Sequence, residues 1–362
     1  MFEYRFRRLR SLIGWLSLTG GVTVCLLGLA AFTAPGFWAA DNMSFFLRQF
    51  LAAGLAGLLG GLRGLTVPHR RPRLYKTSLV LHALLFAMLA GSTVWRTVEH
   101  TRPLTAARPG ETSLRVVATN LETLFLENRT LTDFLTKSEA DVMVFEETGW
   151  WLQKRHWKAL GLPIGAAGKP PFPDHLFVGS LGDISVYSRF PVLESKSIVV
   201  EDRPGQPRQD IREILVLKLD IDGRTVNLVA VHPSSPRTEV QWIRRQTYLE
   251  RLEAVLRDLQ AQSATETIVI GDWNLSPWSV YFSDLFGRLN LHTAFADGFP
   301  QTTRFFFDYR LHWILGAVVD HVAITPGLRF AGVELGPDIG SDHLPLIADI
   351  IVPGGGTANV AN

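Results

Sequence analysis

Residue types that catalyse hydrolysis stand beside short apolar runs in the second half of the chain. They are Asn120, Glu147, His232, Asp272, Asn274, Asp342 and His343. All but the last two end a predicted strand, and those two directly precede one. Because strand ends that converge form a concave polar site, we expect these side chains to lie close together.

The residue types at these positions favour a hard metal ion and phosphoester chemistry. Carboxylate and amide oxygens are suitable ligands for Mg²⁺ or Mn²⁺, whereas the single cysteine, Cys25, excludes a thiolate site. Acids, two histidines and such a metal together suit the hydrolysis of a phosphoryl ester. Each residue alone also has an ordinary interpretation. Strand-terminal Asn and Asp are common turn formers, a lone His232 is more often structural, and Glu146 and Glu147 could be a solvated pair.

The apolar runs predict the elements that must position these residues. Strands are expected at 114–120, 141–147, 184–188, 214–221, 225–232, 267–274 and 344–352. The dipeptide Asp222-Gly223 between two β-branched runs predicts a hairpin. An amphipathic helix is expected between Thr238 and Gln262, and Ser276-Pro277 is typical of the start of another helix. The sequence therefore predicts a mixed, largely antiparallel sheet system covered by helices.

The predicted helix between Thr238 and Gln262 has apolar residues at spacings of three and four. They are Val240, Ile243, Leu252, Val255, Leu256 and Leu259. We expect this apolar face to lie on the sheet.

The first 95 residues predict an all-α membrane segment of about three helices. Apolar runs at about 12–32, 45–67 and 77–95 are each close to the roughly 20 residues that cross a hydrocarbon core of about 30 Å. Arg48 and Arg63, near the ends of the second run, can reach the headgroups. A cleaved signal peptide is the alternative for the first run, but the two further runs favour a retained anchor.

Basic residues around these runs predict the orientation of the chain. They precede the first run or separate the second from the third: Arg5, Arg7, Arg8, Arg10, Arg70, Arg71, Arg73 and Lys76. The positive-inside rule places these residues in the cytoplasm, so three spans place everything after residue 95 outside. We expect 96–113 to be a linker, 114–352 to be the catalytic domain and 353–362 to be a disordered tail.

The ordered motifs resemble the endonuclease/exonuclease/phosphatase superfamily, which has the deoxyribonuclease I-like fold. They are VVATN, ADVMVFEE, VAVHPSSP, IGDWNLSPWS and GSDHLP, spread over about 114–351. The resemblance implies an α/β (α+β) domain in which two mixed β-sheets flanked by helices form a four-layer sandwich. The membrane arrangement looks like that of bacterial members with an N-terminal membrane region. It implies a multi-pass protein of the bacterial inner membrane, with its catalytic domain periplasmic or extracellular.

The resemblance also implies roles for the residues at the strand ends. Glu147 matches the glutamate that binds the divalent cation, and Asn120 matches an asparagine that helps to hold metal and phosphate. His232 matches a histidine that contacts the phosphate. Asp272 matches the aspartate that orients or deprotonates the attacking water, with Asn274 as its phosphate-binding neighbour.

The C-terminal motifs carry the remaining implied roles. Asp342 and His343 match a terminal pair in which the aspartate orients the histidine, and Asp320-His321 resembles a dipeptide near the substrate pocket. Two departures concern the substrate more than the chemistry. Glu146 stands where many relatives have glutamine, and the aromatic stretch TTRFFFDYRLHW does not match the usual substrate-side pattern.

Three functions remain open from the sequence. The favoured one is a membrane-anchored, metal-dependent phosphodiesterase or phosphatase that acts on lipid headgroups or small phosphoesters. The others are an extracytoplasmic nuclease and a noncatalytic membrane-tethered binding module. From Leu114 onward the chain has 23 basic and 30 acidic residues, against 13 and 4 before it, and a net negative domain disfavours a nuclease. A basic and aromatic cluster that could bind nucleic acid or lipid lies at 150–158.

Overall fold

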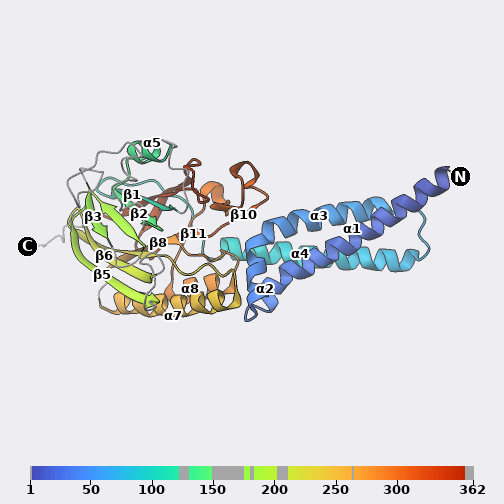
Figure 1. Ribbon diagram of the computed structural model, residues 1–362, viewed down its shortest axis with the longest axis horizontal. Coiled ribbons are helices and arrows are strands. Elements are labelled where there is room, and N and C mark those ends of the chain that lie inside the picture. The colour runs from blue at the N-terminus through green and yellow to red at the C-terminus, as the bar shows by residue number, and fades with distance from the viewer. Residues whose placement is uncertain are drawn as a thin grey trace, which may run out of the picture. The chain divides into compact units, whose positions relative to one another are not determined.

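The computed structural model describes residues 2–121, 130–148, 175–179, 183–201, 211–262 and 265–354. The basic and aromatic cluster at 150–158 and the tail after residue 354 lie outside these ranges. The chain forms two compact units (Figure 1). The first contains Met1–Glu99 with Ser276–Ser283, and the second contains His100–Leu275 with Asp284–Asn362.

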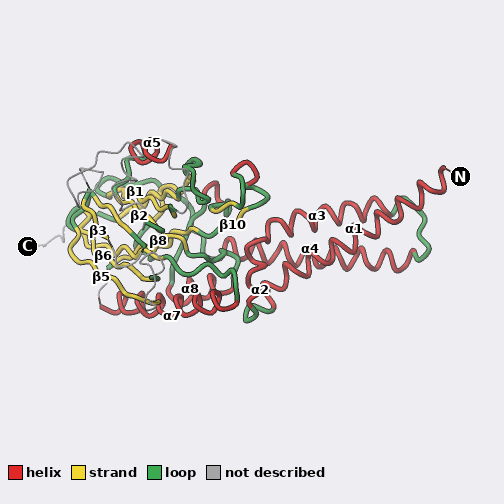
Figure 2. Tube along the Cα trace, in the orientation of Figure 1, coloured by secondary structure: helices red, strands yellow, loops and turns green. Residues whose placement is uncertain are grey.

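The first unit is helical, as Figure 2 shows. Its elements are α1 (Phe2–Thr33), α2 (Trp38–Asn42), the 3-10 helix η1 (Met43–Phe46), α3 (Leu47–Gly64) and α4 (Pro72–Val98). Segments Arg7–Thr33, Trp38–Gly64 and Pro72–Val98, with mean hydropathies of 1.9, 1.5 and 1.7, are long and apolar enough to cross a membrane. The expected segment of about three apolar helices is therefore present.

Glycines let the long helices of this unit pack closely. A Cβ added to Gly57 in α3 would lie 2.8 Å from the Cα of Gly21 in α1, so the two backbones approach each other directly. Tyr75 in α4 donates a hydrogen bond of 2.7 Å to the carbonyl oxygen of Gly61. Small residues in α3 thus form the contact surface for both neighbouring helices.

The second unit contains two mixed sheets. One has the strand order β12 (Arg329–Leu335), β13 (Leu346–Val352), β1 (Thr112–Asn120), β2 (Val142–Glu146), β4 (Ser185–Ser188) and β3 (Leu176–Gly179). The other has the order β11 (Asp320–Ile324), β8 (Glu266–Asp272), β7 (Arg224–Val231), β6 (Arg212–Ile221) and β5 (Val192–Glu201). The pairs β1–β2 and β7–β8 are parallel, and the others are antiparallel.

The apolar faces of the two sheets enclose a shared core. Every second residue of β1 and β13, including Val116 and Ala348, packs with inward residues of β6, β7 and β8. Helix α5 (Thr130–Lys137) covers the outer face of the six-stranded sheet through Leu131 and Leu135. Helix α7 (Glu239–Gln262) lies along β5 and β6 (Figure 1). This arrangement is the expected sandwich of two mixed sheets flanked by helices.

The predicted hairpin is present, with Asp222 and Gly223 in the left-handed region at φ 51° and 80°. The predicted apolar face of α7 is only partly correct. Val240 and Ile243 are 58% and 52% exposed, whereas Leu252, Val255 and Leu256 are buried. The second helix starts at Val280 in α8 (Val280–Leu289), not at Ser276-Pro277.

The expected linker at 96–113 is in large part bound to the second unit. The backbone N–H of Arg102 donates to Thr293 O at 2.8 Å, and that of Thr105 donates to Phe330 O at 2.8 Å. Thr112 already belongs to β1. The polar composition of this segment therefore reflects an exposed but hydrogen-bonded strap.

Candidate active site

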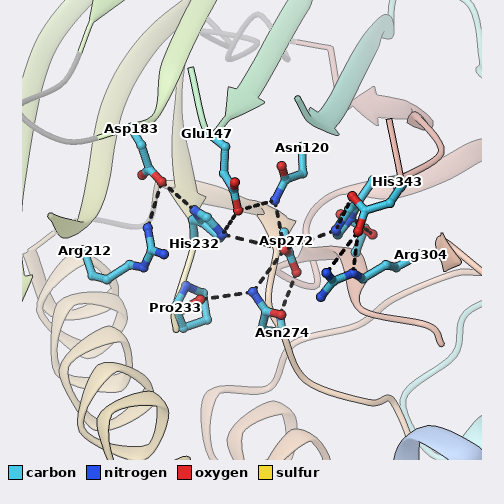
Figure 3. Close-up of polar contacts among 12 residues, drawn as sticks. Asn120, Glu147, Asp183, Arg212, His232, Pro233, Asp272, Asn274, Arg304 and His343 are labelled. Atoms are coloured by element: carbon cyan, nitrogen blue, oxygen red, sulfur yellow. Dashed lines mark hydrogen bonds and ion pairs between the residues drawn. The ribbon is translucent and has the colours of Figure 1, made fainter. Parts of the chain in front are cut away.

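Strand pairing brings most of the predicted site residues to one edge of the sandwich (Figure 3). Asn120 ends β1 and pairs with Glu146 at the end of the parallel strand β2. In the other sheet Asp272 ends β8 and pairs with Asp320, the first residue of β11. Because the carboxyl ends of parallel strands share an edge, the predicted convergence is present.

Unusual backbone conformations aim the side chains at this edge. Glu147 and Asn274 have positive φ values of 56° and 45°, which are uncommon for residues other than glycine and are typical of functional sites. Gly271 has a φ of 142°, and a Cβ there would collide with Val231 O and lie 2.7 Å from Glu146 Oε1. The glycine of the GDWN motif thus lets two strand ends approach each other.

Asp272 is the centre of the hydrogen-bond network. Its Oδ2 accepts from the amide nitrogen of Asn120 at 3.2 Å and from that of Asn274 at 3.0 Å. Its Oδ1 accepts from the backbone N–H of Asn274 at 2.8 Å. The Nε2 atoms of His232 and His343 lie 3.7 and 3.8 Å from Oδ2. The buried carboxylate therefore faces two imidazoles, and the two amides hold it in place.

His343 is oriented by Asp320, and this differs from the pairing expected within the terminal dipeptide. Its Nδ1 lies 3.1 and 3.0 Å from the two carboxylate oxygens of Asp320. The neighbouring Asp342 instead accepts a hydrogen bond of 3.0 Å from Arg304 Nε. The carboxylate bonded to Nδ1 therefore comes from a different strand, β11. The expected orienting role of Asp342 stays a prediction, and its Oδ1 lies 3.9 Å from His343 Nε2.

The surroundings of His343 favour its protonated form. Burial alone lowers the pKa of an imidazole, but here the negative carboxylates of Asp320 and Asp272 more than offset it. The net effect raises the pKa of His343 to about 9. The side chain is therefore a charged donor near neutral pH.

His232 has a carboxylate partner of its own, Asp183, which the sequence analysis missed. His232 Nδ1 lies 2.9 Å from Asp183 Oδ2, and Arg212 Nη1 donates to the same oxygen at 2.8 Å. Burial lowers the pKa of His232, but the charge of Asp183 outweighs it and the net shift is upward. Asp183 lies two residues before β4 and directly before the strand predicted at 184–188, just as Asp342-His343 precede a predicted strand, so the same signal could have found it.

Two predicted residues occupy supporting positions. The amide nitrogen of Asn274 donates to Asp272 and to Pro233 O at 3.1 Å, so its observed contacts hold the aspartate. His321, expected on the substrate side, is 2% exposed and donates from Nε2 to Leu275 O at 2.7 Å. Burial lowers the pKa of His321 to about 4. In these contacts it is a neutral structural residue, and its expected substrate-side position stays a prediction.

Arg245 and Glu146 complete the buried surroundings of the site. Arg245 is fully buried in α7, and its Nη1 donates to the carbonyl oxygen of Asn274 at 3.0 Å. Glu146 is also fully buried. Burial, and then the charges of Asp320 and Asp272, raise the pKa of Glu146 well above the usual range. This shift favours the uncharged acid at Glu146, beside the carboxylate of Glu147.

Comparisons with known proteins place this geometry in context. No curated protein matches the chain. Solved structures that match include TDP2 of D. rerio in complex with a single-stranded DNA product, at 18% identity, covering 66% of this chain and 99% of that one, with a TM-score of 0.47. Sphingomyelinase C from Streptomyces griseocarneus matches at 17% identity with the same coverages and a TM-score of 0.45.

A mannosyl-6-phosphatase of Bacteroides thetaiotaomicron matches at 13% identity, with coverages of 66% and 99% and a TM-score of 0.47. The family model of the Endonuclease/Exonuclease/phosphatase family matches residues 120–343. That range begins at Asn120 and ends at His343, so it spans the site from its first to its last residue. The chain therefore belongs to the Endonuclease/Exonuclease/phosphatase family.

Proposed function

We propose that the chain is a membrane-anchored phosphoester hydrolase, a phosphodiesterase or phosphatase, that requires Mg²⁺ or Mn²⁺. Its catalytic unit lies outside the cytoplasm. The observation that carries the proposal is the pair of histidine–carboxylate dyads, His232–Asp183 and His343–Asp320, whose Nε2 atoms lie 3.7 and 3.8 Å from one oxygen of Asp272. Two oriented imidazoles around one carboxylate suit a reaction that moves protons and develops charge on phosphoryl oxygens.

Glu147 and Asn120 are the residues proposed to hold the cation. The amide of Asn120 donates to Glu147 Oε1 at 3.1 Å and to Asp272 Oδ2 at 3.2 Å, so oxygen-bearing side chains are gathered at one point. The side chain of Glu147 is 28% exposed and can be reached from solvent. Carboxylate and amide oxygens suit a hard divalent cation. When bound, the cation would neutralise charge on the phosphoryl group.

A second group of potential metal ligands exists among the described residues. Asp272, Asp320 and His343 present ligand atoms within 4.8 Å of one another. In this group, however, Asp320 and His343 are already bonded to each other through Nδ1, and the Nε2 atom of His343 faces Asp272. We therefore assign this group to proton transfer and transition-state stabilisation.

The proposed chemistry follows from these contacts. Asp272, held by Asn274 and Asn120, orients the attacking water and accepts its proton. A new P–O bond forms to this water, the P–O bond to the leaving alcohol breaks, and the leaving oxygen takes up a proton from solvent. His343, held by Asp320, donates from Nε2 to a nonbridging phosphoryl oxygen as charge develops. His232, held by Asp183, donates to a second oxygen of the same group. Donors that are oriented before the reaction avoid the cost of reorganisation.

The proposed location rests on the charges that flank the apolar helices. Basic residues lie before α1 and between α3 and α4, including Arg8, Arg71 and Arg73, so these ends are cytoplasmic by the positive-inside rule. The net negative charge from Leu114 onward favours small or lipid phosphoesters over nucleic acid. A reporter fused after Val352 tests the orientation. Activity of an alkaline phosphatase fusion is expected, and activity only of a cytoplasmic reporter would overturn it.

The experiment that tests the activity uses the full chain in phospholipid nanodiscs. Hydrolysis of bis(4-nitrophenyl) phosphate and 4-nitrophenyl phosphate is measured with Mg²⁺, with Mn²⁺ and with EDTA. We expect turnover that needs metal and is lost in His343→Ala, while the control His292→Ala, a partly buried histidine bonded to Arg102, stays active. Nicking of plasmid DNA in place of ester hydrolysis would favour the nuclease, and no turnover of any substrate would contradict the proposal.

A further inference from the structure

A hairpin in the second unit exposes an unusual amount of apolar surface. Strands β9 (Arg304–Phe305) and β10 (Gly316–Ala317) form its base, and residues 306–315 between them are called the hairpin tip here. Phe307 is 98% exposed and Trp313 is 64% exposed. Leu311, Ile314 and Leu315 are exposed as well. Contiguous exposed apolar groups of this kind mark an interaction site.

The hairpin tip is an ordered structure. The backbone N–H of Phe306 donates to Leu315 O at 2.7 Å, which closes the tip. Inside it the 3-10 helix η4 (Tyr309–Leu311) is capped by Asp308, whose side chain accepts from the backbone N–H of Arg310. Phe307 has a φ of 70°, a conformation that is strained for a bulky residue. The fold therefore exposes the aromatic side chain of Phe307 at the expense of backbone strain.

The base of the hairpin is bonded directly to the candidate active site. The backbone N–H of Phe305 donates to Asp342 O at 2.9 Å, and that of Leu344 donates to Thr303 O at 2.7 Å. Arg304 pairs with His343 as an isolated bridge and binds the Asp342 carboxylate. The label β10 in Figure 1 marks this hairpin. The hairpin tip begins at Phe306, directly after Phe305, whose backbone N–H contacts Asp342.

A bilayer surface is the partner that fits the composition of the hairpin tip. Aromatic rings with leucine and isoleucine suit the boundary between headgroups and acyl chains, and a neighbouring arginine suits lipid phosphate. Arg310 provides that cation: its side chain is 87% exposed and is paired with Asp308 at 2.7 Å. The chain also contains three helices long and apolar enough to cross a membrane. It enters the second unit at His100 directly after α4 ends at Val98, so the tether is short.

We propose that the hairpin tip inserts into the headgroup region of the bilayer that holds the chain's own helices, and that the substrate is a phosphoester carried by a membrane lipid. The statement about the substrate rests on the proposed function, whereas the contact with lipid does not. Insertion places the active site at the depth of lipid phosphates, because the base of the hairpin contacts Asp342 and His343.

Insertion is tested with a fluorescent probe on the full chain in nanodiscs. Cys25 is the single cysteine, so a Cys25→Ala background allows labelling of Phe307→Cys with an environment-sensitive nitrobenzoxadiazole group. The matched control is Leu193→Cys on β5, a site 57% exposed in the wild type. Nitroxide lipids should quench the probe at 307 and leave the one at 193 unaffected. Equal quenching at both sites, or none at 307, would overturn insertion and favour a protein partner for the tip.

The lipid substrate is tested with Phe307→Ser/Trp313→Ser against the control Leu176→Ser/Leu193→Ser, whose residues are 55% and 57% exposed on edge strands. Hydrolysis is measured on phosphatidylethanolamine and phosphatidylglycerol in nanodiscs and on bis(4-nitrophenyl) phosphate in solution. The rate of lipid hydrolysis by the tip variant should fall about tenfold or more, while its turnover of the soluble ester stays unchanged. The control should keep both activities.

The outcomes separate the two proposals. Wild-type turnover of the soluble ester with none on either lipid would overturn the lipid substrate while leaving the hydrolase in place. The lipid substrate would also be overturned if the tip variant lost equal activity on lipid and on the soluble ester. The substitutions would then have disturbed the catalytic residues and not the contact with lipid. Absence of all turnover would contradict the proposed function, and the probe at Phe307 would still decide whether the tip contacts lipid.

Discussion

Asp320 and His343 form a dyad across two sheets, because Asp320 begins β11 in one sheet and His343 lies three residues before the start of β13 in the other. The contact therefore depends on correct packing of the sandwich. It also fixes which ring nitrogen faces the site, since Nδ1 is bonded to Asp320 and Nε2 is directed toward Asp272. A carboxylate that orients a histidine in this way stabilises the charged imidazole as the reaction proceeds.

Replacing the two candidate partners of His343 should have unequal effects. Asp320→Asn should lower kcat by about 10² to 10⁴ with little change in KM, because the imidazole loses its orientation and its charge. Asp342→Asn should lower kcat by less than about tenfold, since that side chain is partly exposed and paired with Arg304. Steady-state kinetics on a soluble phosphodiester checks both. Equal losses in the two variants would refute the assignment of the dyad.

The raised pKa of His343 predicts how stability depends on pH. The folded value of about 9 exceeds the ordinary 6.5, so the charged form stabilises the fold fully below pH 6.5, and this contribution is lost as pH rises through 9. Its size is ~3 kcal/mol in the free energy of unfolding. Denaturant unfolding of the full chain in EDTA, at pH 6.5 and 9.5, checks the loss. Asp320→Asn should reduce the change in the free energy of unfolding between these two pH values. An unchanged difference in that variant would show that Asp320 does not cause the raised pKa.

The second dyad predicts a strong coupling between Asp183 and His232. Each single variant, Asp183→Asn or His232→Ala, should reduce kcat by about 10². The double variant should be little worse than His232→Ala, because the carboxylate acts through the imidazole. A double-mutant cycle on kcat measures this coupling. Multiplied losses in the double variant would mean that Asp183 acts separately, for example by holding Arg212.

Glycine substitutions test the close approach of strands at the site. Gly271→Ala should destabilise the fold by about 2 to 4 kcal/mol, because its positive φ and the contacts with Val231 and Glu146 leave no room for a Cβ. Gly223→Ala is the matched control, since its φ is also positive but open space surrounds it. That variant should lower the free energy of unfolding by about 1 kcal/mol. Thermal unfolding measures the stability of both variants. Equal losses of stability would show that the close contacts around Gly271 contribute nothing.

Much of the site was predictable because strand ends can be read from sequence. The apolar runs before Asn120, His232 and Asp272 end where polar residues begin, and parallel pairing then brings those ends to one edge. The Asp222-Gly223 hairpin follows equally from local conformational preference. Pairwise contacts between distant segments were not predictable in this way, because no local pattern specifies the relative placement of two sheets.

The histidine partners illustrate that limit. Asp183 lies 49 residues from His232, and Asp320 lies 23 from His343, so neither partner could be found from nearby sequence. Arg245 was also missed, because a charged residue on an amphipathic helix is expected to face solvent. In the structure it reaches inward to the carbonyl oxygen of Asn274. Buried charges of this kind depend on partners that only the packed fold supplies.

Glu146 provides the last prediction, because its surroundings favour the uncharged acid. Its pKa is raised well above the usual range in the folded state, so the folded protein holds this proton more tightly than the unfolded chain and the fold is destabilised as pH rises above about 4.5. Glutamine has nearly the same shape and carries no charge. Glu146→Gln should therefore be as stable as the wild type at pH 4 and more stable at pH 7. Denaturant unfolding in EDTA measures this difference, and a variant that is less stable at pH 7 would show that the ionised carboxylate is needed.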